Sequence, residues 1–235
     1  MRLLLNRTVQ MYRSLPRIHI FELGGIKCIE SSMDAGPVNT GKMGRPREFE
    51  EKAALDAAMR VFWEKGYEGT SLDDLTAAMG INRSSLYSSF GDKEALFGRV
   101  MARYKEGPMS FMHEALELPS ARAVIEALVL GTVEFLSNPK HPRGCLSLQG
   151  GLACGTGVES VRKAMIDWRT SALTALQKRL QRAGHEGDIP RDVDPKDLAR
   201  YVLVLLNGLG VQAANGATRA EMKRTVELAL RTLPV

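Results

Sequence analysis

The sequence has no apolar run of bilayer length, which excludes a membrane-spanning helix. It has only three cysteines, Cys28, Cys145 and Cys154, and they form neither a metal-ligand cluster nor a disulfide framework. Its four histidines form no recognisable arrangement of base and orienting group for a thiol enzyme. We therefore expect no metal, no cofactor, no membrane partner and no enzymatic activity, in a reducing cytoplasm.

Charge alone does not locate a binding surface in this chain. The net charge of +5 and an isoelectric point near 9.2 suit a nucleic-acid partner. However, residues 44–105 hold ten Lys and Arg against ten Asp and Glu. The placement of charged residues, rather than their sum, must therefore identify such a surface.

A helix-turn-helix pattern runs from Phe49 to Phe97. Apolar residues recur at helical intervals over 55–63 and predict a first amphipathic helix, which Gly66 and Gly69 end.

Capping residues then mark two short helices. Ser71 and Asp74 have capping-box spacing, and Gly80 stands where a tight turn needs a left-handed residue. Asn82 can cap a third helix over residues 83–90.

The third helix has small and hydroxylic residues where a core would need apolar ones. Leu86 and Phe90 are four residues apart and point inward. The remaining positions, which face outward or sideways, are Arg83, Ser84, Ser85, Tyr87 and Ser88. A major groove admits such a helix, arginine can bind guanine edges, and hydroxyl groups can reach bases or phosphates. Lys93 lies beside the free amides of the next helix, where a phosphate oxygen is favoured.

The stretch Gly69–Phe97 contains T-S-L-D-D-L, G-I-N-R-S-S-L-Y-S-S-F and G-D-K-E-A-L-F, and it resembles the DNA-binding domain of TetR-family transcriptional regulators. The resemblance implies that Tyr87 and Lys93 bind phosphates and that Arg83, Ser84 and Ser85 face bases. The complete set of predicted DNA contacts is Arg45, Arg47, Thr70, Ser71, Arg83, Ser84, Ser85, Tyr87, Ser88 and Lys93. The alternative is a helical domain whose polar faces are merely solvated.

Residues 1–42 differ from the rest, with no sustained periodicity and a turn-rich run over 31–41. We interpret them as a disordered extension and Met43 as the natural start. Residues 44–47 would then form a cationic arm able to enter a minor groove, the alternative being a flexible tail that touches no DNA.

The predicted fold is all-α, with a three-helix DNA-binding domain at 43–97 and a larger helical domain for effector binding and dimerisation at 98–235. The later helices are expected at Asp92–Leu116, Ser120–Leu136, Gly144–Cys154, Val158–Ala183, Asp197–Ala214 and Thr218–Leu233.

The helix Asp197–Ala214 is apolar over more of its circumference than one core contact needs. The resemblance implies that it pairs with Thr218–Leu233 in a four-helix homodimer interface. Twofold symmetry would then present two recognition helices to a palindromic operator. A monomeric bundle is the alternative.

The resemblance also implies a pocket among the middle helices, where a small, mostly apolar or aromatic effector would bind and release a repressor from its operator. The candidate walls are Phe111, Met112, Phe135, Cys145, Leu148, Gln149, Leu152, Met165, Trp168 and Tyr201. Each of these residues can equally be ordinary core.

Cys145 suggests a second kind of regulation. It lies in H-P-R-G-C-L at an expected helix start, where the amides, His141 and Arg143 could stabilise a thiolate. Some TetR-like regulators with P-x-G-C-L at this junction respond to electrophiles or oxidants. The alternatives are a small buried apolar cysteine, or a cysteine enzyme with His141 or His113 as base. An architectural DNA binder without an effector would leave the large second domain unexplained.

Overall fold

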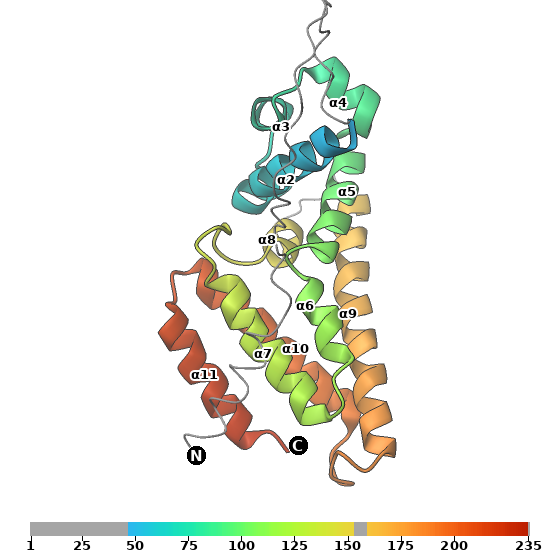
Figure 1. Ribbon diagram of the computed structural model, residues 1–235, viewed down its shortest axis with the longest axis vertical. Coiled ribbons are helices and arrows are strands. Elements are labelled where there is room, and N and C mark those ends of the chain that lie inside the picture. The colour runs from blue at the N-terminus through green and yellow to red at the C-terminus, as the bar shows by residue number, and fades with distance from the viewer. Residues whose placement is uncertain (1–46, 153–158, 235) are drawn as a thin grey trace, which may run out of the picture. The chain divides into compact units, whose positions relative to one another are not determined.

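The computed structural model describes residues 47–152 and 159–234, and all regular structure in these ranges is helical (Figure 1). The helices are α2 (Arg47–Lys65), α3 (Leu72–Met79), α4 (Arg83–Phe90), α5 (Lys93–Glu106), α6 (Ser110–Leu116), α7 (Ala121–Leu136), α8 (Leu146–Leu152), α9 (Glu159–His185), α10 (Pro195–Ala214) and α11 (Arg219–Thr232). The prediction of an all-α fold is confirmed. The predicted extension, residues 1–42, lies outside the described residues. Within the described part of the chain, no helix combines the length and apolarity that crossing a membrane requires.

The predicted caps around the turn are present. The Ser71 hydroxyl accepts from the Asp74 N–H, and the Asp74 carboxylate accepts from the Ser71 N–H, each at 3.0 Å. Gly80 ends α3 at a φ of 67°, a left-handed conformation that costs glycine little. The Asn82 side chain then caps α4 by accepting from the Ser85 N–H at 2.8 Å. The angle between α3 and α4 is thus fixed by short-range chemistry.

The prediction of a single long helix from Asp92 to Leu116 is wrong. The chain leaves α5 after Glu106 and begins α6 at Ser110. Pro108 causes this break because a proline disfavours helical geometry in the residue before it, and Gly107 has a φ of −102° and a ψ of −99°. Two helices, rather than one, therefore lead from the predicted helix-turn-helix into the rest of the protein.

The buried side chains of α2 to α5 form one core that continues into α8 and the start of α9. Its largest fully buried members in the N-terminal helices are Trp63, Tyr104, Phe62, Phe97, Leu75, Leu86 and Leu96. The predicted boundary after residue 97 falls inside α5, where Val100, Met101 and Tyr104 belong to the same core as Leu86. Helices α2 to α5 and α8 therefore share apolar contacts.

A second core joins α7, α9, α10 and α11, and Figure 1 shows α7 running beside α10 and α11. Arg179 of α9 is buried and donates to the Leu116 carbonyl at 3.1 Å and the Leu118 carbonyl at 2.6 Å. Because the last carbonyls of a helix have no partner within it, Arg179 satisfies the end of α6 and ties α9 to it.

Candidate DNA interface and internal cavity

Helix α4 presents a polar face to solvent over an apolar anchor. Leu86 and Phe90 are 1% and 6% exposed, whereas the Tyr87 side chain between them is 52% exposed. Arg83, Ser84 and Ser88 are exposed, and Ser85 is half-buried. The structure therefore brings the predicted base-reading residues together on one surface helix.

Arg83 is paired with Asp73 of the preceding helix. Its Nη2 lies 2.8 Å from Asp73 Oδ1, and this hydrogen bond raises the pKa of the Arg83 guanidinium. Both side chains are more than half exposed, so the pair is worth little in water and can be exchanged for a nucleotide.

Lys93 opens α5 close to the recognition helix. Its ammonium lies 4.4 Å from the centroid of the Tyr67 ring, a cation–π contact, and partial burial lowers its pKa against the opposing effect of Glu68. The Asp92 side chain caps the same helix by accepting from the Ala95 N–H at 2.8 Å. The ammonium and the free amides of this helix end can both favour a phosphate oxygen.

Thr70 does not fit its predicted role as a DNA contact. Its side chain is buried, and its hydroxyl donates to the Gly66 carbonyl at 2.6 Å. Ser71 is exposed, but its hydroxyl is used in the cap of α3. A hydrogen bond from Lys65 at 2.6 Å, together with the bonds from Ser71, holds the pKa of the Asp74 carboxyl well below its usual value. These residues brace α3 against α2.

The predicted cationic arm, residues 44–47, lies almost wholly outside the described residues. Arg45 lies outside the described residues, and Arg47 is the first residue of α2, with no description of its side chain.

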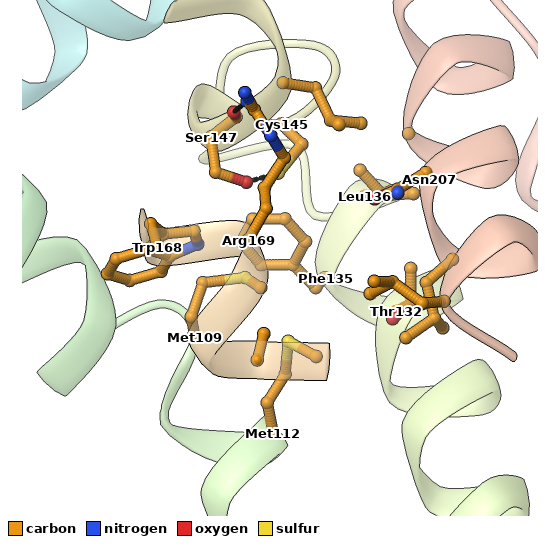
Figure 2. A pocket seen from close by; sticks show the side chains of 15 residues that line it. Met109, Met112, Thr132, Phe135, Leu136, Cys145, Ser147, Trp168, Arg169 and Asn207 are labelled. Carbon is orange, nitrogen blue, oxygen red and sulfur yellow. Dashed lines mark hydrogen bonds between the residues drawn. The ribbon is translucent and has the colours of Figure 1, made fainter. Parts of the chain in front are cut away.

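A cavity of about 50 Å³ lies among α6 to α10 (Figure 2). Of the predicted wall residues, the cavity brings together Met112, Phe135, Cys145, Leu148 and Trp168. It is also lined by Asn207, a polar residue on an otherwise apolar helix face that could orient a ligand, and by residues that the sequence did not suggest, which are Met109, Thr132, Leu136, Ser147, Arg169, Ala172, Leu203, Leu206 and Gly210.

The other predicted wall residues lie elsewhere. Phe111 packs so closely on Gly131 that a Cβ there would meet its ring at 2.6 Å. Met165 is fully buried in the first core, and Tyr201 is 50% exposed on α10. Phe111, Met165 and Tyr201 are therefore not cavity walls in this structure.

Gln149 belongs to a different hollow, of about 180 Å³, which it lines together with residues 64–69 of the α2–α3 connection. Leu152 ends α8, and its side chain is outside the described part of the chain.

Arg169 is the most consequential residue that the sequence analysis missed. It follows Met165 by four residues and precedes Ala172 by three, so it continues the apolar stripe of α9. That spacing places Arg169 on the apolar side of α9, but it does not show that this side lines a cavity.

The cavity is joined to the DNA-binding helices through Trp63 of α2. Its Nε1 donates to the Gly144 carbonyl at 3.2 Å, and its ring packs at 5.0 Å on Tyr104 and at 5.5 Å on Phe135. The Tyr104 hydroxyl lies 3.2 Å from the Cys145 sulfur, and burial raises the pKa of Tyr104 well above its usual value. Contacts thus lead from α2 directly to residues of the cavity wall.

An exposed recognition helix, anchored on two supporting helices and followed by a larger helical domain, defines a helix-turn-helix DNA-binding transcriptional regulator. The family profile of "Bacterial regulatory proteins, tetR family" matches residues 54–100, and that of the tetracyclin repressor-like C-terminal domain matches residues 121–229.

Individual relatives agree with these matches. The chain is 29% identical over 194 residues to the transcriptional repressor ComR of Escherichia coli (strain K12), covering 81% of this chain and 92% of ComR. It is 33% identical over 162 residues to the regulator YezE of Bacillus subtilis (strain 168), covering 68% of this chain and 84% of YezE. Among solved structures, a cysteine-substituted variant of the TetR-family regulator CifR, complexed with 26-base-pair operator DNA, matches with a TM-score of 0.76 and 38% identity, covering 81% of this chain and all of that one. The chain belongs to the TetR family of transcriptional regulators, a family of non-enzymatic proteins.

Proposed function

We propose that this protein is a homodimeric repressor that binds a palindromic operator and leaves it when a small molecule enters the cavity. The observation that carries the proposal is the polar outer face of α4, where Tyr87 is 52% exposed directly beside the buried anchor Leu86. The repressor name of ComR and the operator complex of CifR support it.

An exposed apolar stripe supports dimerisation through the last two long helices. Tyr201, Val204 and Val211 of α10 are 50%, 64% and 46% exposed, and their spacing places them on one helix face. On α11, Leu228 is 64% exposed. Solvent-exposed apolar groups of this size are typical of an interface, and a twofold dimer would present two copies of α4 to two operator half-sites.

Effector control requires only that the ligand bind one conformation of the dimer better than another. The contacts of Trp63 with Gly144 and Tyr104 give a physical connection between the cavity wall and α2. A change in the packing of α8 would therefore tilt the DNA-binding helices.

Lys93→Ala and Tyr87→Phe should weaken binding to all DNA sequences, because both side chains are assigned to phosphates. For Lys93→Ala, the slope of log affinity against log salt should fall by about one. Fluorescence anisotropy with a DNA fragment selected from a random pool, repeated at several salt concentrations, measures both quantities.

Lys105→Ala is the matched control, since Lys105 is an exposed lysine at the far end of α5. It should leave affinity and slope unchanged. An unaltered salt slope in Lys93→Ala would refute the phosphate contact.

Regulation through the Cys145 thiol is a second candidate, because this side chain lines the cavity. Its sulfur lies 3.2 Å from the Tyr104 hydroxyl and 3.0 Å from the Ser147 hydroxyl. The cations expected beside it are elsewhere: a ring nitrogen of His141 lies 3.1 Å from the Phe135 carbonyl, and Arg143 is exposed. His141 is thus engaged with the Phe135 carbonyl and His113 is exposed on α6, so neither base proposed for a cysteine enzyme is seen to contact the thiol.

A sensing Cys145 should react with iodoacetamide at pH 6, where ordinary thiols are protonated and slow. Mass spectrometry of a variant carrying Cys28→Ser and Cys154→Ser would follow this one thiol. Reaction only at alkaline pH would remove the sensing hypothesis.

A further inference from the structure

The cavity wall carries one charged side chain. Among the described residues that line it, Arg169 is a cation and none is a carboxylate. Arg169 is half-buried, and its Nη1 donates to the Ser147 carbonyl at 3.1 Å (Figure 2). Over residues 51–149 and 159–234, no carboxylate forms an ion pair with it.

Asp167, the nearest acidic residue along α9, does not pair with Arg169. The carboxylate of Asp167 is bound by Lys163 at 2.7 Å on the exposed side of the helix. Arg169 therefore keeps most of its five N–H donors for another partner, at a site where water is partly excluded. A guanidinium in such a place gains most from an anion that meets its planar fork.

The rest of the wall is mainly apolar, with a few neutral polar groups. Met109, Met112, Phe135 and Trp168 surround the space below the guanidinium in Figure 2. Thr132 and Asn207 add hydrogen-bonding groups from α7 and α10. This wall fits a ligand with one charged end and an apolar body.

We infer that the effector is a small monocarboxylic acid with an apolar or aromatic tail, whose carboxylate is bound by Arg169. The inference rests on the proposed function of the cavity as the effector site, and it names the chemical class of the ligand. The volume of about 50 Å³ requires the wall to open on binding. Two flexible methionines, Met109 and Met112, can repack to allow it.

The test compares ligands of nearly equal shape and different charge. Isothermal titration of the DNA-free protein with benzoate, benzamide and benzylamine, and with hexanoate and hexanamide, measures binding without reference to an operator. At least one acid should bind about 10- to 100-fold more tightly than its amide, the range expected for hydrogen bonds to a charged partner. Benzylamine should not bind.

Arg169→Gln should abolish this preference for the acid, and Arg169→Lys should restore part of it. Arg182→Gln is the matched control, because Arg182 is an exposed arginine on the same helix that pairs with Glu186. It should bind the acid like the natural sequence. Thermal unfolding of each variant separates loss of the ligand site from loss of the fold, and the comparison of acid with amide on the natural sequence needs no variant.

Three results would overturn the inference: equal affinity for acid and amide, undiminished acid binding by folded Arg169→Gln, or no binding of either acid at millimolar concentration. Operator release is then measured by anisotropy. An acid that binds through Arg169 without releasing DNA would contradict the proposed regulation and leave the carboxylate site standing. Release of DNA by a neutral ligand, and not by any acid, would support the proposed regulation and contradict the carboxylate site.

Discussion

Val204→Arg should convert the proposed dimer into a monomer and lower operator affinity by roughly 100-fold or more, because like charges juxtaposed across an interface cost several kcal/mol. Val204 is 64% exposed in the middle of the apolar stripe of α10. In the proposed twofold interface, the added guanidinium would lose its water, and the partner subunit would add a second like charge. Light scattering after size exclusion measures the mass, and anisotropy with the selected DNA fragment measures the affinity.

Ile166→Arg provides the control for this change. Ile166 is also an exposed aliphatic residue, at 42%, but it lies on α9 outside the stripe. It should remain a dimer with normal affinity. A Val204→Arg protein that stays dimeric and still binds the operator would show that the interface is not on this face of α10.

Trp63→Ala should lower the free energy of unfolding by about 3–5 kcal/mol, the usual cost of deleting a buried aromatic side chain. Trp63 is 2% exposed and contacts both DNA-binding and cavity residues, including Tyr104 and Phe135. Its loss would also leave the Gly144 carbonyl without its indole donor. Since domains are stable by only about 5–15 kcal/mol, the effect is a large part of the total. Urea denaturation followed by circular dichroism measures it.

Tyr87→Ala deletes an aromatic side chain at the surface, and it should change operator affinity rather than stability. Its stability should change by less than about 0.5 kcal/mol, since it leaves no cavity. Its operator affinity should nevertheless fall. If Trp63→Ala unfolded at the same urea concentration as the natural sequence, Trp63 would not be an important packing contact between α2 and the cavity wall.

The sequence predicted best what neighbouring residues decide. The caps formed by Ser71 and Asn82 and the turn at Gly80 depend on backbone groups within a few residues, so their spacing carries the information. The break before α6 is also determined by neighbouring residues, because Gly107 and Pro108 are the signal for it. It was missed because apolar residues continue on both sides and suggest one uninterrupted helix.

The cavity wall depends instead on how distant helices pack. Tyr201 was a reasonable wall residue by composition, yet the rotation of α10 turns it to solvent. Arg169 has a charge that argues for the surface, and only the packing of α9 against α7 and α10 places it inward. No pattern within one helix fixes that rotation.

The ion pair between Arg83 and Asp73 affects how a DNA-binding protein discriminates between its operator and other DNA sequences. Before contact, the guanidinium already has two N–H groups, Nε and Nη2, directed at one carboxylate oxygen, at 3.3 Å and 2.8 Å. A base edge with a single acceptor replaces that arrangement poorly, whereas O6 and N7 of guanine accept from both groups. In the proposed operator complex, a guanine edge would therefore replace Asp73 more readily than a base edge with one acceptor, and the exposed pair itself adds little to stability.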